Sequence, residues 1–294
     1  MIAINWGTSN FRAWKLNAGG KVEDERSSGR GAMSVSPGRF HDALIAEVGD
    51  WVSAGETRVL MSGMVGARNG WKEAPYVPVP VSLQQIVKAV TRVAADSANS
   101  VDVRIVPGMI GSDENGIPEV MRGEETEIFG SGIRAAAPNH VCLPGTHTKW
   151  VRVEGETVAD FSTSMTGDLF KAIREGTILR ASTQQEVSDT DAFLLGVARS
   201  RQDGELAHHL FGVRTLVLTG AMKEKSASSY LSGILIGHEV KANTQKGEPV
   251  HLIGEPALCK LYAIALGTCG VDSTLEPEGA ALRGLLRIAE KLAW

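Results

Sequence analysis

The sequence predicts an α/β protein of two domains, with mixed sheets flanked by helices, and three observations support this. The chain has 294 residues, which is about two domains' worth. In the second half, short apolar runs typical of strands alternate with segments of helical periodicity, a pattern that predicts βαβ units and partly parallel sheets. A strand–Gly-Thr–strand pattern occurs once in each half, which indicates a duplicated unit.

Composition argues against several classes of protein. The net charge of -4 gives no electrostatic basis for binding nucleic acid. No apolar run reaches the roughly 18 residues of a membrane helix, and the first residues lack the basic and apolar regions of a signal peptide. Cys142, Cys259 and Cys269 form no CxxC pair, which argues against zinc and against a disulfide framework. We therefore expect a cytoplasmic protein that binds neither nucleic acid nor membranes, and the oligomeric state stays open.

The first half opens with a predicted hairpin. Apolar and polar residues alternate over residues 2–16 and are interrupted by the turn Gly7-Thr8-Ser9-Asn10. The polar stretch 17–31 is expected to hold a third strand. A long loop at residues 63–80 is rich in glycine and proline. The other predicted elements of this half are helices at 40–52, 83–93 and 120–129 and strands at 59–62 and 103–106.

Gly130, Gly132 and Pro138 break the pattern in the middle of the chain. We therefore expect domains 1–133 and 134–294, and we allow the last helix to pack back on the first domain. The pair His208-His209 has no ligand partners at metal-binding spacing and is interpreted as an exposed helix face. The second half is expected to contain a hairpin at 141–162, strands at 215–218 and 250–254, and helices at 230–240, 257–266 and 278–292.

The two Gly-Thr turns are candidates for binding phosphate. Gly7-Thr8-Ser9 follows the first strand, and Gly145-Thr146-His147-Thr148-Lys149 follows an apolar strand in the second half. Glycine lets backbone N–H groups approach an anion closely, and hydroxyl groups add donors. Either turn alone is explained as simply by a hairpin. Their presence in both halves favours a pair of phosphate loops.

Adjacent carboxylates occur at Glu124 and Glu125, at the start of a predicted helix. Carboxylates there are stabilised by the helix dipole, and the same groups could act as a general base; their spacing does not separate these interpretations. Asp168 is interpreted as a helix-start residue.

The loop at residues 62–78 is a candidate for binding a small polar molecule. It offers the guanidinium of Arg68, the carboxamide of Asn69 and the indole of Trp71, groups that suit a ligand with a carboxylate or several hydroxyls. A surface connection and a protein interface are the alternatives.

Five stretches of the chain together resemble one known family. They are residues 4–14 (INWGTSNFRAW), 61–78 (MSGMVGARNGWKEAPYVP), 120–126 (VMRGEET), 143–150 (LPGTHTKW) and 165–170 (MTGDLF). They span most of the chain in order, the second is long enough to be specific, and the family that they resemble is the 2-dehydro-3-deoxygalactonokinases.

The resemblance implies a two-domain fold of the actin, sugar-kinase and Hsp70 type, which is ribonuclease H-like, with ATP in a cleft between the domains. It also implies transfer of the γ-phosphoryl group to the terminal (6-) hydroxyl of 2-dehydro-3-deoxy-D-galactonate in galactonate breakdown.

The resemblance also implies roles for individual residues. The Gly-Glu-Glu turn is similar to the catalytic-glutamate motif of exopolyphosphatases in the same superfamily, and this similarity favours Glu125 over Glu124 as the base. The strand ending at Gly254 would lie where the superfamily binds adenosine. Lys149 would steady the transferred phosphate, or be a solvated strand residue. The phosphate loops would be Gly7, Thr8 and Ser9, and Gly145, Thr146 and His147; Arg12 or Arg68 would bind the substrate carboxylate, in a pocket shaped by Asn10, Asn69 and Trp71.

The chain departs from the family pattern at Asn5, where the family has Asp. This position is the one expected to hold Mg²⁺ through water, and asparagine keeps an oxygen but loses the charge. The sequence thus predicts an ATP- and Mg²⁺-dependent kinase acting on a small sugar acid. A phosphoanhydride hydrolase of the exopolyphosphatase type and a sugar-acid sensor that has lost catalysis through Asn5 are the alternatives. The preference between galacto and gluco acids stays open.

Overall fold

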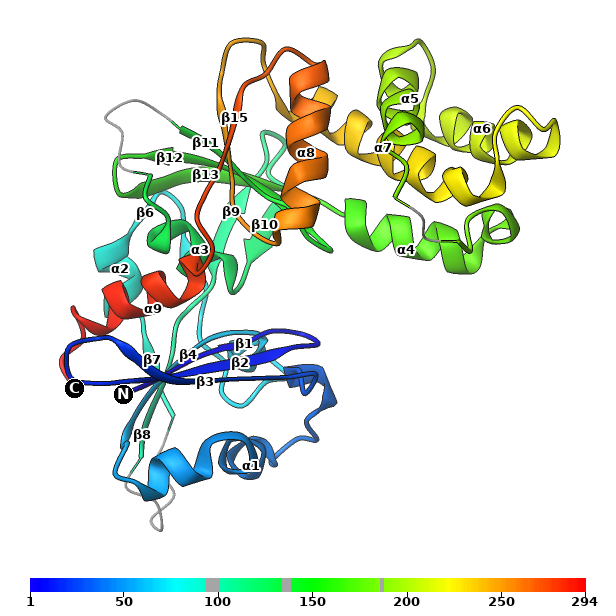
Figure 1. The fold of residues 1–294 in the computed structure, drawn as a ribbon. Helices are drawn as coiled ribbons and strands as arrows, with labels where there is room; N and C mark the ends of the chain where they lie inside the picture. The colour runs from blue at the N-terminus through cyan, green and yellow to red at the C-terminus, as the bar shows by residue number, and fades with distance from the viewer. Residues whose placement is uncertain (94–100, 134–138, 186–187) are drawn as a thin grey trace. The chain divides into compact units, whose positions relative to one another are not determined.

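The computed structural model describes residues 1–93, 101–133, 139–185 and 188–294 (Figure 1). The chain forms two compact units. Unit 1 consists of Met1–Pro138, Arg152–Phe161 and Pro277–Trp294, and unit 2 of Asn139–Val151 and Ser162–Glu276. The expected boundary after residue 133 adjoins residues 134–138, which lie outside the described residues.

The main sheet of unit 1 is built around the predicted N-terminal hairpin. Strand β1 (Ile2–Trp6) pairs antiparallel with β2 (Phe11–Leu16), and β2 pairs antiparallel with β3 (Val22–Ser28). On its other side β1 runs parallel to β4 (Arg58–Gly63), and β4 runs parallel to β8 (Asp102–Ile105). With β7 (Thr91–Arg92) at the edge, the strand order is β3-β2-β1-β4-β8-β7.

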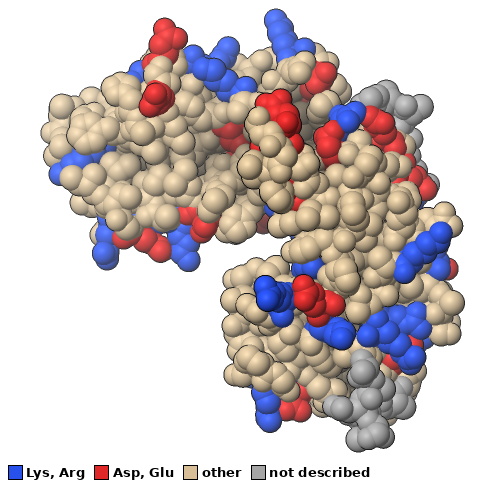
Figure 2. All heavy atoms as spheres, turned by 180° about the vertical axis from the view of Figure 1, so that it is seen from behind, with Lys and Arg blue, Asp and Glu red and all other residues tan. Residues whose placement is uncertain are grey.

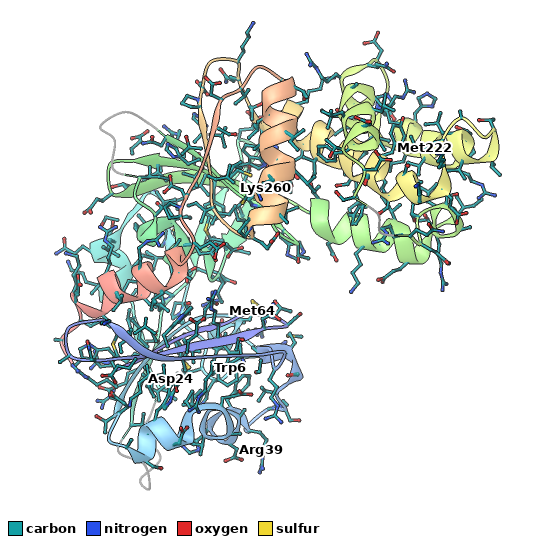
Figure 3. All side chains as sticks on the ribbon, in the orientation of Figure 1. Trp6, Asp24, Arg39, Met64, Met222 and Lys260 are labelled. Carbon is teal, nitrogen blue, oxygen red and sulfur yellow. The ribbon has the colours of Figure 1, made fainter. Side chains whose placement is uncertain are left out.

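The core of unit 1 lies between this sheet and helix α1 (Phe40–Ser53), which covers one of its faces (Figure 1). The helix buries Phe40, Leu44, Val48 and Trp51, which recur at helical spacing. Trp6 of β1 packs edge-on against the ring of Phe40, with 5.7 Å between the ring centroids (Figure 3). The predicted hairpin and the first predicted helix are therefore confirmed.

A second group of elements in unit 1 carries the glutamate turn. Strands β5 (Val77–Pro78), β9 (Met109–Ser112) and β10 (Pro118–Met121) form a small sheet, and helix α3 (Glu124–Gly130) follows β10. The last helix, α9 (Ala280–Ala289), also belongs to unit 1 and packs on α3. This packing is close: a Cβ on Gly284 would lie 1.8 Å from the carbonyl oxygen of Thr126. The remaining elements of unit 1 are β6 (Val81–Ser82), α2 (Leu83–Lys88) and two short 3₁₀ turns, η1 (Ala32–Ser34) and η2 (Met64–Gly66).

The sheet of unit 2 repeats the topology of unit 1. Its strands are β11 (Asn139–Leu143), β12 (Thr148–Glu154), β13 (Thr157–Ser164), β14 (Val250–Leu252) and β15 (Ser273–Leu275), and the hairpin end of β12 and β13 belongs to unit 1. The order β13-β12-β11-β14-β15 matches β3-β2-β1-β4-β8, and the last three strands are parallel in both sheets. A Gly-Thr turn joins the equivalent strands in each, which confirms the duplication that the sequence indicates.

Helices make up the rest of unit 2. Helices α5 (Thr190–Arg201) and α7 (Glu224–Asn243) pack closely, since a Cβ on Gly233 would lie 2.1 Å from the carbonyl oxygen of Phe193. No helix among the described residues is long and apolar enough to cross a membrane. Acidic and basic side chains are interspersed over the face shown in Figure 2. The helical elements are α4 (Thr166–Gly176), η3 (Ile178–Ser182), α5 (Thr190–Arg201), α6 (Leu206–Leu218), α7 (Glu224–Asn243) and α8 (Pro256–Thr268).

Four sequence predictions about local structure were wrong. Residues 215–218 belong to α6 and not to a strand, because a short apolar run fits a helix as well as a strand. The helix predicted at 83–93 ends at Lys88, since the following residues pair with β8. The helix predicted at 120–129 begins only at Glu124, after β10 and Gly123. His209 is not exposed but fully buried, with its Nδ1 2.9 Å from Nε2 of His238.

Candidate active site

The first Gly-Thr turn joins β1 and β2. The N–H of Gly7 donates to the carbonyl of Asn10 (2.9 Å), and the side chains of Thr8, Ser9 and Asn10 are exposed. The turn lies against the segment that follows β3, where a Cβ on Gly31 would be 2.1 Å from the carbonyl oxygen of Thr8. Only glycine fits at position 31, and close packing against it therefore holds the backbone of the turn in place.

The second Gly-Thr turn, between β11 and β12, is supported in the same way. The N–H of Asp168 donates to the carbonyl of Thr146 (2.9 Å), and a Cβ on Gly167 would lie 2.4 Å from the carbonyl oxygen of Gly145. Thr146 and His147 are exposed, and the His147 Nε2 lies 3.7 Å from the Asp168 carboxylate. Asp168 lies in the first turn of α4, as the sequence suggests. Both turns thus present an exposed tip over a glycine with no room for a side chain.

Three segments of unit 1 converge at Gly63, the last residue of β4. Asn5 pairs with Ser62 across β1 and β4, and its Oδ1 would lie 3.3 Å from a Cβ on Gly63. A Cβ on Gly123 would lie 3.5 Å from the Cα of Gly63. Gly63 and Gly123 have φ angles of +94° and +110°, which side-chain-bearing residues rarely adopt. The convergence lies at the carboxyl end of parallel strands, where open α/β sheets bind their ligands.

Glu125 is the acid of this region whose pKa is raised most. Its side chain is fully buried, its Oε2 accepts a hydrogen bond from the N–H of Gly123 (2.6 Å), and its Oε1 has no hydrogen-bond partner among the described residues. Burial, followed by the nearby charge of Glu124, raises the pKa of Glu125 to about 8. A carboxylate with a raised pKa and an open acceptor is suited to take up a proton.

Glu124 has a different environment from its neighbour. Its side chain is only partly buried, and its Oε2 accepts a hydrogen bond from the N–H of Arg122 (3.0 Å). The structure therefore separates two carboxylates that the sequence spacing left equivalent, and it makes Glu125 the stronger candidate for a base.

Sequence reasoning missed two polar residues beside this turn, Arg122 and Ser62. The Arg122 Nη2 donates to the carbonyl of Ala74 (2.7 Å), and its guanidinium lies 4.4 Å from the ring centroid of Tyr76. Its Nε and Nη1, together with the Ser62 Oγ, are buried without a hydrogen-bond partner among the described residues. Arg122 could have been singled out by its position directly before the Gly-Glu-Glu turn; no signal in the local pattern marks Ser62.

Arg12 and Asn10, two of the predicted substrate-binding residues, line one hollow of about 530 Å³ next to the first turn. The Arg12 Nε already lies 2.6 Å from the Glu25 carboxylate, and its guanidinium lies 5.1 Å from the ring centroid of Trp14. Arg12 would therefore have to exchange its present partner for a substrate.

The other predicted substrate-binding residues lie in the loop after η2. Arg68 and Asn69 are exposed, and Arg68 forms no ion pair or hydrogen bond within the described part of the chain. Trp71 instead packs inward, stacked on Phe40 at 6.4 Å and edge-on to His41 at 6.2 Å. Its contacts are those of a residue that anchors the loop to the core.

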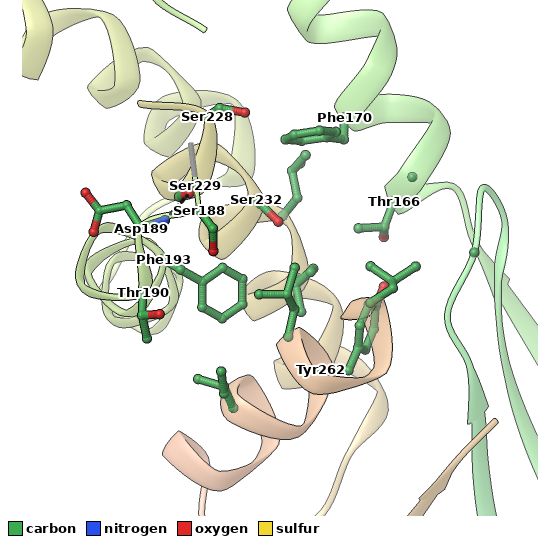
Figure 4. Close-up of a pocket in the computed structure, with 17 residues that line it drawn as sticks. Thr166, Phe170, Ser188, Asp189, Thr190, Phe193, Ser228, Ser229, Ser232 and Tyr262 are labelled. Atoms are coloured by element: carbon green, nitrogen blue, oxygen red, sulfur yellow. Dashed lines mark hydrogen bonds between the residues drawn. The ribbon is translucent and has the colours of Figure 1, made fainter. Parts of the chain in front are cut away.

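Unit 2 contains a cavity of about 350 Å³ (Figure 4). Thr190 and Phe193 lie on one side of it, and Thr166 and Tyr262 lie on the other. Gly145 of the second turn also lines the cavity, which therefore adjoins a candidate phosphate loop. A concave, largely apolar space with a few hydroxyl groups is typical of a small-molecule site. The other lining residues are Gly167, Phe170, Ser188, Asp189, Ser228, Ser229, Ser232, Leu235, Ile236, Leu258, Leu261 and Ile264.

Two further predicted site residues, Gly254 and Lys149, also lie in unit 2. Gly254, with φ of +141°, precedes α8, and a Cβ on it would lie 3.5 Å from the carbonyl oxygen of Pro144. It therefore adjoins the second turn. Lys149 is buried, and its Nζ donates to the Thr163 Oγ1 (3.0 Å), so the solvated-strand interpretation of this lysine was wrong.

The described residues contain no group of three or more His, Cys, Asp or Glu side chains able to hold a metal. Magnesium in phosphoryl-transfer sites is usually held by one or two carboxylates together with phosphate oxygens and water. The Asn5 oxygen beside Gly63, with the Glu124 and Glu125 carboxylates on the adjoining turn, fits such an incomplete site. The charge would come from Glu124, and Asn5 would contribute only a neutral oxygen.

Comparison with known proteins places this arrangement in a family. A model of the 2-keto-3-deoxy-galactonokinase family matches residues 5–288. A probable 2-dehydro-3-deoxygalactonokinase of Rhizobium meliloti is 36% identical over 99% of this chain and 97% of its own length. The 2-dehydro-3-deoxygalactonokinase of Escherichia coli is 34% identical over 99% of this chain and 98% of its own length.

Solved structures agree with this assignment. A Sinorhizobium meliloti protein, provisionally assigned as a 2-dehydro-3-deoxygalactonokinase, has a TM-score of 0.90 at 35% identity and covers 98% of both chains. The activator of 2-hydroxyisocaproyl-CoA dehydratase from Clostridium difficile, with a TM-score of 0.51 at 12% identity over 99% of this chain and 94% of its own, shares the fold alone. The actin-like fold class is confirmed, and neither the hydrolase nor the sensor alternative is favoured. The chain belongs to the 2-keto-3-deoxy-galactonokinase family of carbohydrate kinases.

Proposed function

We propose that this kinase uses ATP and Mg²⁺ to phosphorylate the terminal (6-) hydroxyl of 2-dehydro-3-deoxy-D-galactonate, in the cytoplasm and as a step of galactonate breakdown. The names of two relatives that match nearly the whole chain support this acceptor. The observation that carries the chemistry is the buried Glu125 carboxylate, with one oxygen lacking a partner among the described residues.

In the proposed reaction, Glu125 accepts the proton of the acceptor hydroxyl through its Oε1. The hydroxyl oxygen forms a bond to the γ-phosphorus, and the bond between that phosphorus and the β,γ-bridging oxygen breaks, which releases ADP. With a pKa near 8, Glu125 is mostly protonated at neutral pH, so the rate should rise as the pH increases toward 8 and more of the deprotonated base becomes available. Since phosphoryl transfer depends mainly on positioning and on neutralising charge, this base would act together with well-placed donors and Mg²⁺.

The nucleotide is proposed to bind through unit 2. The cavity beside Gly145 would hold the nucleoside, and the exposed tip at Thr146 and His147 would contact phosphates. Gly7, Thr8 and Ser9 form the equivalent tip in unit 1, and Lys149 and Gly254 support the second turn. When bound, Mg²⁺ would neutralise phosphate charge, and Asn5, through water, and Glu124 would be the residues that hold it.

We propose Arg68 as the residue that binds the substrate carboxylate, with Asn69 beside it. Arg68 is exposed and has no ionic partner among the described residues, whereas Arg12 is already paired with Glu25. Arg68→Gln should raise the KM for the sugar acid by about tenfold to a hundredfold, because a charge-assisted bidentate pair is lost. Arg12→Gln, the matched control, should change this KM by less than about threefold. Steady-state kinetics at saturating ATP measure both, and the reverse ranking would make Arg12 the carboxylate partner.

Product analysis tests the proposed reaction directly. The protein is incubated with ATP, Mg²⁺ and 2-dehydro-3-deoxy-D-galactonate, and the products are separated by ion exchange. Equal amounts of ADP and phosphorylated acid are expected. Free phosphate formed without acceptor would support a hydrolase, and binding of the acid without turnover would support a sensor. The gluco epimer and a neutral deoxyhexose serve as comparison acceptors.

A further inference from the structure

A second buried glutamate, Glu239 on α7, lies outside the groups used so far. Its exposed fraction is 6%, and both of its carboxylate oxygens have partners. The indole N–H of Trp150 donates to Oε1 (2.7 Å), and the hydroxyl of Tyr262 donates to Oε2 (2.9 Å). The Thr166 side chain also hydrogen-bonds to this carboxylate. Four segments of unit 2 therefore meet at one buried acid: β12, α4, α7 and α8.

The network continues from Glu239 to the second Gly-Thr turn. The Tyr262 hydroxyl lies 2.9 Å from the Thr148 Oγ1, which is fully buried, and the N–H of Gly145 donates to that same Oγ1 (3.4 Å). A carboxylate can only accept, so the Tyr262 proton points to Glu239, and the Thr148 proton must then point to Tyr262. The Thr148 oxygen is left as an acceptor for Gly145. Each bond of the chain is thus oriented by the carboxylate at its end.

Three members of this network line the cavity that we propose for the nucleotide. Tyr262, Thr166 and Gly145 line the cavity of Figure 4, and Gly145 begins the exposed tip of the second turn. Burying a carboxylate is unfavourable, and a well-packed apolar side chain at the same place would often be at least as stable. Stability alone therefore does not explain Glu239, whereas a requirement for one fixed arrangement of Tyr262 and the turn does.

We propose that Glu239 is a positioning residue for the nucleotide, which through Tyr262 and Thr148 holds the second Gly-Thr turn in register with the wall of the cavity. This inference rests on the proposed use of that cavity by ATP. Glu239 does not contact the reacting atoms. Its expected effect is on nucleotide affinity, with little effect on the affinity for the sugar acid.

The test interrupts the hydrogen-bond network at two points and compares each variant with a matched control. Tyr262→Phe removes the central hydroxyl, and Thr148→Val removes the next hydroxyl without altering a residue that lines the cavity. Thr148→Ser keeps that hydroxyl, and Trp150→Phe removes the other hydrogen bond of Glu239 without interrupting the path to Gly145. The dissociation constant of ADP is measured by titration calorimetry, together with the KM values for ATP and for the sugar acid and the thermal midpoint of each variant.

Tyr262→Phe and Thr148→Val should each weaken ADP binding by about tenfold, which corresponds to the loss of about one hydrogen bond. The double variant should be no weaker than either single variant, since both interrupt the same path. The KM for the sugar acid should stay within about twofold. Thr148→Ser and Trp150→Phe should bind ADP like the unmodified protein, even where their thermal midpoints fall.

Three results would overturn the proposal. The first is Thr148→Val with normal ADP affinity, which would mean that Tyr262 acts by touching the nucleotide itself. The second is an equal rise in the KM values for ATP and the sugar acid, which would indicate general loosening. The third is an unmodified protein that does not bind ADP. Because ADP binding needs no acceptor, a protein that binds ADP but makes no phosphorylated acid would disprove the proposed acceptor and leave this test intact.

Discussion

Among the described residues, Glu125 of unit 1 and Glu239 of unit 2 are the glutamates with the least exposed side chains, and their carboxylates are partnered in different ways. Glu125 of unit 1 has one oxygen bonded to the N–H of Gly123 and the other without a partner among the described residues. Glu239 of unit 2 has both oxygens occupied, by Trp150 and Tyr262. Burial is the largest cause of the raised pKa at both.

A raised pKa therefore does not by itself identify a base. An open acceptor on a buried carboxylate leaves room for a proton from a substrate, while a fully bonded carboxylate can only hold its neighbours in place. The two sheets have the same topology, so the difference lies in the side chains around each acid. We therefore propose proton transfer for Glu125 of unit 1 and positioning for Glu239 of unit 2.

The largest expected effect separates the two glutamates by function. Glu125→Gln should lower kcat by roughly 10²–10⁴ and leave the dissociation constant of ADP within about twofold, because only the proton acceptor is lost. Glu124→Gln should have a much smaller effect on kcat. Single-turnover kinetics and ADP calorimetry measure both quantities. If both variants keep near-normal turnover, the base lies elsewhere, and Asp168 is the next candidate.

The glycines beneath and within the two turns should respond in opposite ways. Gly31→Ala and Gly167→Ala should each lower the free energy of unfolding by about 3 kcal/mol, since the new methyl group meets backbone atoms at 2.1 Å and 2.4 Å. Gly145→Ala has open space and should fold with nearly unchanged stability, yet bind ADP less well if phosphate approaches the backbone there. Urea unfolding and calorimetry check this prediction. Equal stability losses at Gly145 and Gly167 would contradict it.

The stability of the two glutamate variants should change with opposite sign. The folded-state pKa of Glu125 is about 8 and its ordinary value is 4.5, so the folded protein holds a proton that the unfolded chain releases between these pH values. Stability is therefore lost as pH rises from 4.5 to 8. Glu125→Gln should remove this loss and gain roughly 2–4 kcal/mol at pH 9, with little change at pH 4.

Glu239→Gln should instead lose stability, because an amide offers one acceptor where Trp150 and Tyr262 both donate. Since burial also raises the pKa of Glu239, this loss should become smaller as pH rises, without turning into a gain. Burial also raises the pKa of Glu127, to about 7. This group makes the unfolding free energy of both variants change with pH in the same way. The measurement is therefore the difference in unfolding free energy between each variant and the unmodified protein across pH. A gain at pH 9 for Glu239→Gln would remove the distinction between the two acids.

The smallest effect is expected at Asn5. Asn5→Asp adds a negative charge beside the proposed metal position and should lower the Mg²⁺ concentration for half-maximal rate by about tenfold, or about 1.4 kcal/mol. If the glutamates of unit 1 already supply enough charge, the two Mg²⁺ titration curves will superimpose. That result would make the substitution of the family's Asp by Asn5 neutral for this enzyme.

The fold class, the duplicated strand–turn–strand units and the kinase family could all be predicted from the amino-acid sequence. These depend on local signals: apolar alternation around Gly7-Thr8, a long specific stretch at 61–78, and turn residues at fixed spacing. Such features depend on residues that are adjacent in the sequence, because backbone conformation and strand alternation are local properties. Element boundaries were less secure where an apolar run suits either a strand or a helix, as at residues 215–218 in α6.

Packing of distant segments determines which of the two adjacent glutamates is buried with an oxygen that has no partner among the described residues. It also determines that Arg12 is paired with Glu25 and that Trp71 anchors its loop in the core. The network from Glu239 to Gly145 joins residues more than ninety positions apart, so no local pattern could reveal it. The physical reason is common to all of these: burial, desolvation and hydrogen-bond completeness depend on neighbours that packing brings together from distant parts of the chain.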